Sequence, residues 1–291
     1  MYYDKLMETL SNDNTQETLL NNIINPFSLY YLCNHYYGTE IKTYNIPIPK
    51  DKNDILTTNN LSSIKDFDIV HCQVNYFEKF YSEILNNIEV KIILTTGQWH
   101  LPQIHKSDLT EKVLNHKNVL LWVSQNPIYE NSSKYMAFPY GIESGHLGIY
   151  SDILKMSQTT KINNIATLPI NNATNVCRKK LPVLPSISTY DFYIHLKKAK
   201  FILSPIGDRD DCYRHYEAIG LGAIPISNAG HLYRSIFGNS MYYCNIDEMV
   251  TIMNTQYIDT EYTEPDKNLI CFNYFADIVR KAIAENIILK I

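Results

Sequence analysis

The chain has 291 residues, a formal net charge of −4 and an isoelectric point near 6.1. This length is enough for one large α/β domain or for two smaller ones. The slightly acidic balance offers no basic surface for a polyanion, so nucleic acid is excluded as the expected partner.

The six cysteines are scattered along the chain without a Cys-x-x-Cys pair, which predicts reduced thiols rather than a disulfide framework or a zinc site. The start, residues 1–14, has neither a basic region nor an apolar core of the kind found in signal peptides. No apolar stretch approaches the roughly 20 residues of a membrane span. We therefore expect a soluble intracellular protein, cytoplasmic and without an integral membrane segment.

In the first half, short apolar runs alternate with helical spacing. The predicted strands are Ile69 to Cys72, Lys91 to Thr95 and Val119 to Val123. Residues 76–85 have the apolar spacing of a helix. This alternation predicts a parallel sheet covered by helices. The segment 138–143, FPYGIE, followed by polar residues to about Gln158, indicates a domain boundary.

The second half repeats the pattern. The predicted strands are Ile165 to Leu168, Phe201 to Ser204, Ala223 to Ile226 and Met241 to Cys244, and the predicted helices are Thr189 to Lys200 and Phe272 to Ile288. Ser188 or Thr189 is the expected N-cap of the first of these helices. We expect a first α/β domain over 1–145, a second over 146–271, and a C-terminal helix, 272–291, that packs back on the first.

Residues 200–226 carry the most information. A strand pattern ends at Ser204-Pro205, a polar loop with Gly207 follows, and a helix is predicted from about Asp211, with Asp210 or Asp211 as its cap. Such a helix start suits a phosphate, because its N–H groups lack partners and its dipole is positive there. Arg214 adds a forked cationic donor, and the Glu217 carboxylate suits the diol of a ribose. In the other interpretation, Arg214 and Glu217 form an ordinary i, i+3 surface pair. The spacing supports the nucleotide site and the surface pair equally.

These residues resemble a known family. The runs are Leu203-Ser204-Pro205-x-Gly207, Asp211-Cys212-x-Arg214-x-x-Glu217-Ala218 and Gly222-x-Ile224-Pro225-Ile226. Over about 40 residues they are similar to the C-terminal half of exostosin-type glycosyltransferases and to the related protein-O-mannose-pathway xylosyltransferases. The segment 177–181 resembles the Arg-x-x-Leu stretch that precedes them, and 139–143 resembles the Pro-x-Gly-Val-Asp linker of many such transferases.

The resemblance implies a GT-B fold, with two Rossmann-like parallel-sheet domains facing a central cleft, and inverting transfer of a sugar from a nucleotide donor, usually a UDP-sugar. The acceptor would be a hydroxyl of a glycan or a protein-linked glycan. Glu217 would hold the ribose, and Arg214 with the helix start would hold the diphosphate. The implied donor-binding set is Arg178, Ser204, Pro205, Gly207, Asp211, Cys212, Tyr213, Arg214 and Glu217. No cofactor or metal is implied, because the helix start and Arg214 supply the positive potential.

Inverting transfer needs a base that takes the proton of the acceptor hydroxyl. We expect it on the domain opposite the donor, and the candidates in rank order are Glu143, His100 and His71. For each of them a structural role is the competing interpretation.

Two acidic pairs match the metal-binding Asp-x-Asp pattern. Asp66-x-Asp68 precedes its strand and is interpreted as a turn, whereas for Asp208-x-Asp210 both helix capping and a metal role stay open. The pair His100 and His105 lacks a sufficient set of further ligands, so we predict no metal site there.

Two other classes compete with the transferase. One is a sugar-nucleotide epimerase or hydrolase on the same fold, and the other is a non-catalytic protein that only binds a nucleotide sugar. The donor sugar, the acceptor and the oligomeric state are left open by the sequence.

Overall fold

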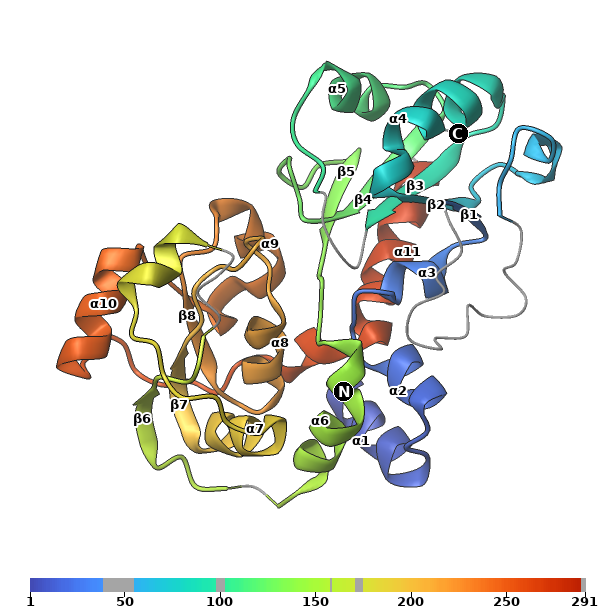
Figure 1. Ribbon diagram of the computed structural model, residues 1–291. Helices are drawn as coiled ribbons and strands as arrows, with labels where there is room; N and C mark the ends of the chain where they lie inside the picture. The colour runs from blue at the N-terminus through green and yellow to red at the C-terminus, as the bar shows by residue number, and fades with distance from the viewer. Residues whose placement is uncertain (39–54, 98–102, 158, 171–174, 289–291) are drawn as a thin grey trace. The chain divides into compact units, whose positions relative to one another are not determined.

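The computed structural model describes residues 1–38, 55–97, 103–157, 159–170 and 175–288 (Figure 1). The chain divides into two compact units. Unit 1 comprises Met1–Asn25 and Tyr140–Tyr274, and unit 2 comprises Pro26–Pro139 and Phe275–Ile291. Each unit is built on its own parallel sheet. The protein is thus a mixed α/β protein with two Rossmann-like units, which agrees with the GT-B expectation.

The division differs from the expected one at three places. The chain enters unit 1 at Tyr140 rather than after residue 145, and the first 25 residues join unit 1 instead of the first sheet. An isolated β-bridge between Ile23 and Cys271 joins the N-terminal segment to the later part of the chain. Local sequence patterns cannot predict such a long-range contact. The C-terminal helix crosses from one unit to the other at Phe275.

Unit 2 contains a five-stranded sheet of order β1-β2-β3-β4-β5, in which every neighbouring pair is parallel. The strands are β1 (His35–Tyr37), β2 (Ile69–Gln73), β3 (Ile92–Gly97), β4 (Val119–Gln125) and β5 (Tyr135–Phe138). The α-helices are α3 (Ser28–Leu32), α4 (Phe77–Lys79), α5 (Asp108–Leu114) and α11 (Phe272–Ile288). Shorter turns are η2 (Leu61–Ser63), η3 (Val74–Tyr76), η4 (Phe80–Ile84, a π-helical turn) and η5 (Leu85–Asn87).

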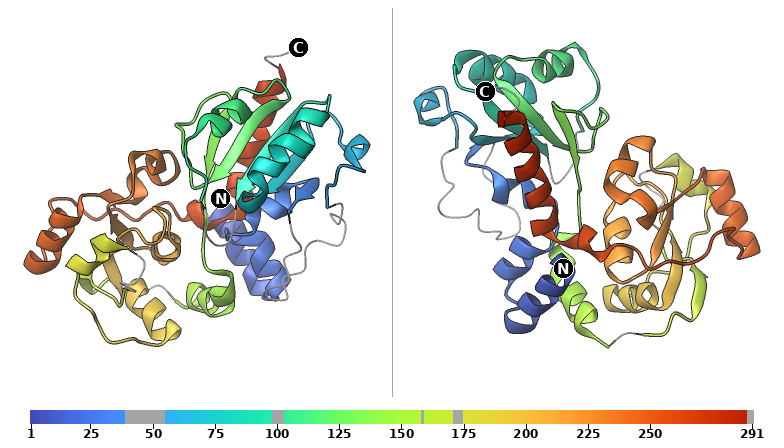
Figure 2. Two further views of the ribbon diagram at one scale, coloured as in Figure 1. Left: turned by 45° about the horizontal axis from the view of Figure 1, so that its top comes forward. Right: turned by 180° about the vertical axis from the view of Figure 1, so that it is seen from behind.

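The three strands predicted for the first half are confirmed as β2, β3 and β4. All residues of β3 and β4 are buried, as expected for parallel strands that are covered on both faces. The predicted helix over 76–85 is split into a short α-helix and a π turn. The ring of Phe275 packs against Phe138 of β5 with centroids 5.9 Å apart, so α11 lies against this sheet (Figure 2).

Unit 1 contains a four-stranded parallel sheet of order β6-β7-β8-β9. The strands are β6 (Asn163–Ala166), β7 (Ala199–Leu203), β8 (Ile224–Ser227) and β9 (Tyr242–Tyr243). The helices are α1 (Tyr2–Asn12), α2 (Gln16–Asn22), α6 (Leu147–Lys155), α7 (Thr189–Lys198), α8 (Tyr213–Gly220), α9 (Arg234–Phe237) and α10 (Ile246–Thr255). Turns of 3-10 type are η6 (Ser144–His146), η7 (Val176–Lys180), η8 (His231–Tyr233), η9 (Gly238–Ser240) and η10 (Lys267–Ile270).

The strands and helices predicted for the second half are all present. Ser188 is the N-cap of α7, and its hydroxyl accepts a hydrogen bond from the backbone N–H of Asp191. Tyr193 of α7 is fully buried, whereas Tyr190 in its first turn is half exposed. Gly222 ends the loop before β8 with φ +76°, a backbone conformation that favours glycine.

Gly141 joins the two units and has φ +89°. A Cβ atom built on it would lie 2.4 Å from the carbonyl oxygen of Ile24, so only glycine fits at this crossing. The backbone of Ile142 in turn donates to the same carbonyl. This explains why the sequence marks the boundary with a Pro-x-Gly segment.

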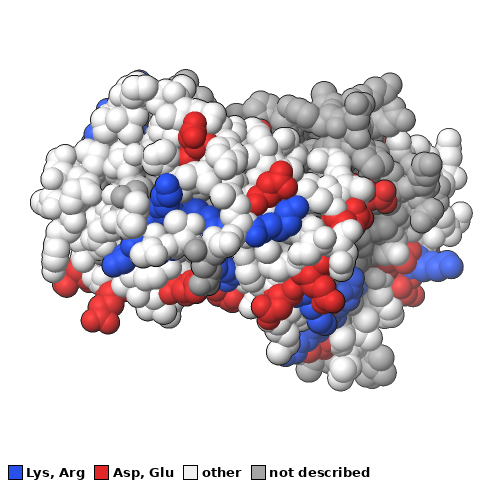
Figure 3. Space-filling model, turned by 90° about the horizontal axis from the view of Figure 1, so that it is seen from below, with Lys and Arg blue, Asp and Glu red and all other residues white. Residues whose placement is uncertain are grey.

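The surface carries mixed charge. On the face shown in Figure 3, acidic and basic side chains are interspersed. Within the described ranges, no helix is both long enough and apolar enough to pass through a lipid bilayer.

Candidate nucleotide-sugar site

A cavity of about 490 Å³ opens in unit 1 beside the ends of β6 and β7. Pro169 follows β6, Pro205 follows β7, and the first two turns of α8 supply Tyr213, Arg214 and Glu217. The carboxyl ends of parallel strands and the starts of the following helices are the usual ligand-binding edge of such a sheet. The lining residues are Glu143, His146, Pro169, Arg178, Ser186, Ile187, Thr189, Phe192, Tyr193, Pro205, Cys212, Tyr213, Arg214 and Glu217.

Glu217 is a buried carboxylate in the cavity wall, only 6% exposed. The phenolic hydroxyl of Tyr193 donates to its Oε1 across 2.8 Å. Burial raises the pKa of Glu217 to about 7, and the pKa would be higher without the Tyr193 hydrogen bond and the charge of Arg214. The carboxyl group therefore changes charge near neutral pH.

Arg214 is anchored by the backbone. Its guanidinium donates to the carbonyl oxygens of Pro169 and Leu203 and lies over the ring of Phe192, 5.0 Å from the centroid. Burial lowers its pKa, but an arginine stays protonated even so. Arg214 and Glu217 thus have separate partners inside the cavity, and the interpretation as an exposed surface pair is wrong.

Arg178 adds a second guanidinium to the wall. Its Nε donates to the carbonyl oxygen of Ile206 across 2.8 Å and its terminal nitrogen to that of Pro205 across 3.2 Å. Gly207 leaves room for it, since a Cβ there would lie 2.8 Å from the same nitrogen. Two guanidinium groups beside one cavity create the positive potential that a diphosphate needs.

Three of the predicted donor-binding residues do not line the cavity. Ser204 is fully buried at the end of β7, and its backbone N–H donates to Ile226. Asp211 is also fully buried and accepts hydrogen bonds from the backbone N–H of Tyr140 and the hydroxyl of Tyr216. Gly207 makes space for Arg178. These three residues shape the loop that carries the lining residues. Sequence spacing cannot distinguish residues that shape the loop from residues that line the cavity.

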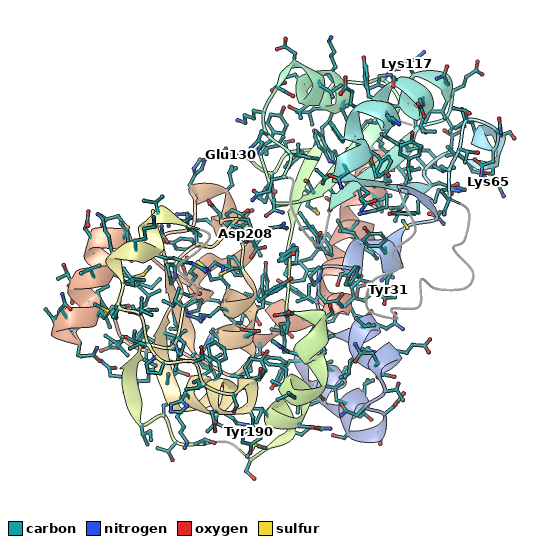
Figure 4. The ribbon with its side chains drawn as sticks, in the orientation of Figure 1. Tyr31, Lys65, Lys117, Glu130, Tyr190 and Asp208 are labelled. Carbon is teal, nitrogen blue, oxygen red and sulfur yellow. The ribbon has the colours of Figure 1, made fainter. Side chains whose placement is uncertain are left out.

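The expected cap of α8 is wrong. The N-cap is Cys212, one residue beyond Asp211. The Oδ2 atom of Asp210 accepts from the backbone N–H of Gly230 instead. Asp208 is exposed in the loop after β7 (Figure 4). Within the described residues, no group of three or more His, Cys, Asp or Glu side chains could hold a metal ion.

Tyr213 lies on the cavity wall and stacks on Tyr140, with ring centroids 5.1 Å apart and an interplanar angle of 21°. The guanidinium of Arg209 lies over the ring of Tyr140, 4.4 Å from its centroid. Tyr140, Tyr193 and Arg209 are not among the site residues predicted from the sequence. The single available signal in the sequence is its high tyrosine content, 23 residues.

The three residues predicted as candidate bases differ in where they lie. Glu143 lines the cavity and its Oε2 lies 3.4 Å from Nδ1 of His146. It belongs to unit 1, the same unit as the donor-site residues, because the chain enters that unit at Tyr140. The expectation that it lies on the opposite domain is therefore wrong.

His71 is a core residue and not a candidate base. It is fully buried in the middle of β2, its Nδ1 lies 2.9 Å from the hydroxyl of Thr95, and burial lowers its pKa to about 3. His100 lies outside the described residues. Asp66 and Asp68 accept from the backbone N–H groups of Lys91 and Lys65, which confirms the turn before β2.

The two parallel sheets define a Rossmann-like α/β protein with a cavity at the carboxyl ends of β6 and β7. Residues 149–234 match the family model of the RXYLT1 C-terminal domain. This stretch, less than half of the chain, is thereby related to the xylosyltransferase family, and at that level to the glycosyltransferases. It contains Arg178, Cys212, Arg214 and Glu217, but not Glu143. No curated protein matches the chain.

Proposed function

We propose that the protein is an inverting glycosyltransferase of the exostosin-related xylosyltransferase type, which uses a UDP-linked sugar as its donor. The main support is the convergence of two arginines and one buried carboxylate on a single cavity at the start of α8. This combination suits a nucleoside diphosphate, since its diphosphate is anionic and its ribose offers two neighbouring hydroxyl donors.

In the proposed complex, the diphosphate lies between Arg178, Arg214 and the N-terminus of α8. Both guanidinium groups are held by backbone carbonyls, so they need little reorganisation as charge develops on the leaving diphosphate. The ribose diol donates to Glu217, one to two turns further along the same helix. No protein-held metal is needed for this arrangement of charges.

Glu143 is the proposed base that takes the proton of the acceptor hydroxyl as the hydroxyl attacks the anomeric carbon. It lines the same cavity, and His146 lies within ion-pair distance of it. A carboxylate of this kind can act only where the acceptor hydroxyl comes within hydrogen-bond reach. The acceptor is proposed to be a hydroxyl of a glycan or of a protein-linked glycan.

The test has two stages. Thermal melting in the presence of UDP, GDP and CMP, and of their sugars, measures donor binding, because a bound ligand stabilises the folded state. We expect a shift with uridine nucleotides that Glu217→Ala abolishes. No shift with any nucleotide would contradict the proposal.

Turnover of the bound UDP-sugar then separates transfer from the competing activities. Transfer requires an acceptor and should be lost in Glu143→Gln, while that variant keeps the nucleotide-induced melting shift. Equal donor turnover with and without acceptors would identify a hydrolase or an epimerase. Binding without any turnover would identify a non-catalytic nucleotide-sugar-binding protein.

A further inference from the structure

Cys212, His215 and Asp211 form a row of ionisable groups at the start of α8. The Sγ of Cys212 lies 3.3 Å from Nε2 of His215, and Nδ1 of the same ring lies 3.8 Å from Oδ1 of Asp211. The imidazole ring and the carboxylate are fully buried. Only the thiol end of the row reaches the cavity, where Cys212 is a lining residue.

The buried carboxylate favours a charged imidazole. Oδ2 of Asp211 accepts two hydrogen bonds, from the backbone of Tyr140 and from the Tyr216 hydroxyl. Oδ1 has no hydrogen-bond partner among the residues that the structure describes, and it lies 3.8 Å from Nδ1 of His215. Burial by itself would lower the pKa of His215, but the charges of Cys212 and Asp211 outweigh it and raise that pKa. These two charges favour the imidazolium form of the ring, whereas the backbone N–H of Cys212, 3.5 Å from Nδ1, favours an unprotonated Nδ1.

The imidazolium in turn favours a thiolate. Burial raises the pKa of Cys212, but His215 and then Arg178 outweigh it, and the net pKa is lowered. As the N-cap of α8, the sulfur also lies at the positive end of the helix dipole. Cations beside a cysteine at a helix start are the usual setting of a reactive thiol.

Further charges lie near the pair, because the Arg214 guanidinium interacts electrostatically with Cys212 and the Glu217 carboxyl with His215. Arg178 comes from η7, and Asp211 precedes α8. Ser204 after β7, Ser227 of β8 and the ring of Phe237 in α9 also contact His215, and all three are neutral. The Nε2 atom lies 3.1 Å from the Ser227 hydroxyl and 3.2 Å from the Ser204 carbonyl oxygen, which keep the ring beside Cys212.

The other cysteines provide an internal comparison. Cys244 and Cys177 are partly exposed like Cys212, yet burial raises the pKa of Cys244 to about 12. Cys33, Cys72 and Cys271 are buried. Among the six thiols, Cys212 combines access to the cavity with an imidazolium partner.

We propose that Cys212 is a thiolate modification site inside the cavity, which captures small disulfides such as glutathione disulfide and thereby blocks the ligand site. The thiolate attacks one sulfur of the disulfide. A sulfur–sulfur bond forms to Cys212 while the bond within the reagent breaks, and the second half leaves as a thiolate. Excess thiol reverses the exchange by the same route. The adduct occupies the space beside Arg214 and Tyr213, since all three residues line one cavity.

The test measures modification rates for each cysteine in the intact folded protein. Iodoacetamide is used first, and peptide masses report alkylation over a range of pH from about 5 to 9. We expect Cys212 to react at least about tenfold faster than Cys177 or Cys244 at the acidic end, because its lowered pKa favours the thiolate there. Equal rates for the three thiols at low pH would overturn the proposal.

A variant tests the role of the imidazole. His215→Gln should move the alkylation of Cys212 to higher pH, while Cys177 keeps its rate. If this variant does not fold, the pH profile of the parent decides, because a rate that rises only with the ordinary titration of a free thiol contradicts the thiolate assignment. Cys212→Ser confirms which peptide carries the fast label.

Glutathione disulfide and nucleotide then connect the site to the cavity. The proposal predicts a mixed disulfide on Cys212, removed by dithiothreitol, and loss of any UDP-induced melting shift in the modified protein. Fast capture without any nucleotide binding by the parent would contradict the proposed function and leave this inference standing. Nucleotide binding together with a Cys212 that reacts with neither reagent would contradict this inference and leave the proposed function standing.

Discussion

Tyr193 of α7 donates its phenolic hydrogen to Oε1 of Glu217 in α8 across 2.8 Å, inside the cavity. Neither side chain has another hydrogen bond among the described residues. The bond sets the direction of the carboxylate and stabilises its ionised form, because a hydrogen bond to the charged state favours that state. The charge and the orientation of Glu217, the residue proposed to bind the ribose, thus depend on Tyr193, which lies 24 positions earlier in the chain.

Tyr193→Phe should weaken nucleotide binding near neutral pH. Removal of the hydroxyl raises the pKa of Glu217 further, so less of the carboxylate is available for the ribose diol. Hydrogen bonds to charged groups contribute about 1.5–3 kcal/mol, and we expect about a tenfold or larger loss of affinity that diminishes at higher pH. Isothermal titration with UDP measures it. Tyr190→Phe, on the exposed side of α7, is the matched control and should bind like the parent.

Glu217→Gln should change the pH dependence of stability. The folded pKa of about 7 lies above the ordinary value of 4.5, so the folded state binds more protons between these limits and its stability falls as pH rises through this window. At about 1.4 kcal/mol per pKa unit, the loss reaches about 3 kcal/mol above pH 7.

The glutamine variant lacks this loss and can still accept from Tyr193. It should therefore be more stable than the parent at about pH 8, with a difference that shrinks towards about pH 4.5. Urea unfolding at several pH values measures the difference. A constant difference at all pH values would show that Glu217 does not titrate in this window.

Gly207→Ala should reduce nucleotide binding and also lower stability, because two backbone carbonyls lose their guanidinium donor. The added Cβ would meet the end of the Arg178 side chain at 2.8 Å, and a flexible side chain can move away. The guanidinium would then leave its carbonyl partners at Pro205 and Ile206. Gly148→Ala, where nothing lies within 4 Å of the new Cβ, is the control and should keep full binding. Equal UDP affinity in both variants would exclude Arg178 from the site.

Arg214→Ala should lower stability as well as nucleotide binding. It leaves the carbonyl oxygens of Pro169 and Leu203 without this donor, and each unpaired buried polar group costs about 1–3 kcal/mol. Arg214→Lys keeps the positive charge but not the fork, so it should bind UDP more weakly than the parent and more tightly than the alanine variant. Melting temperature and UDP affinity, measured together, separate the two effects. An unchanged melting temperature in Arg214→Ala would contradict the anchoring role.

The sequence by itself determined the local architecture. Apolar runs that end in polar residues specified β2, β3, β4, β7 and β8, since a parallel strand covered on both faces must be apolar throughout. The Pro-x-Gly segment marked the point where the chain passes between units. Only a glycine at position 141 tolerates the positive φ and the close contact with the backbone of Ile24. The motif from Ser204 to Glu217 also indicated the position of the cavity.

Tertiary structure alone decided which of those motif residues face the cavity. Asp211 and Cys212 are neighbours in the chain, yet the first is enclosed by Tyr140 and Tyr216 and the second lines the cavity. The unit that holds Glu143, the pairing of Tyr193 with Glu217 and the burial of His71 were likewise beyond sequence pattern. Each depends on contacts between segments far apart in the chain, whose energies arise only when the packed core removes water from them.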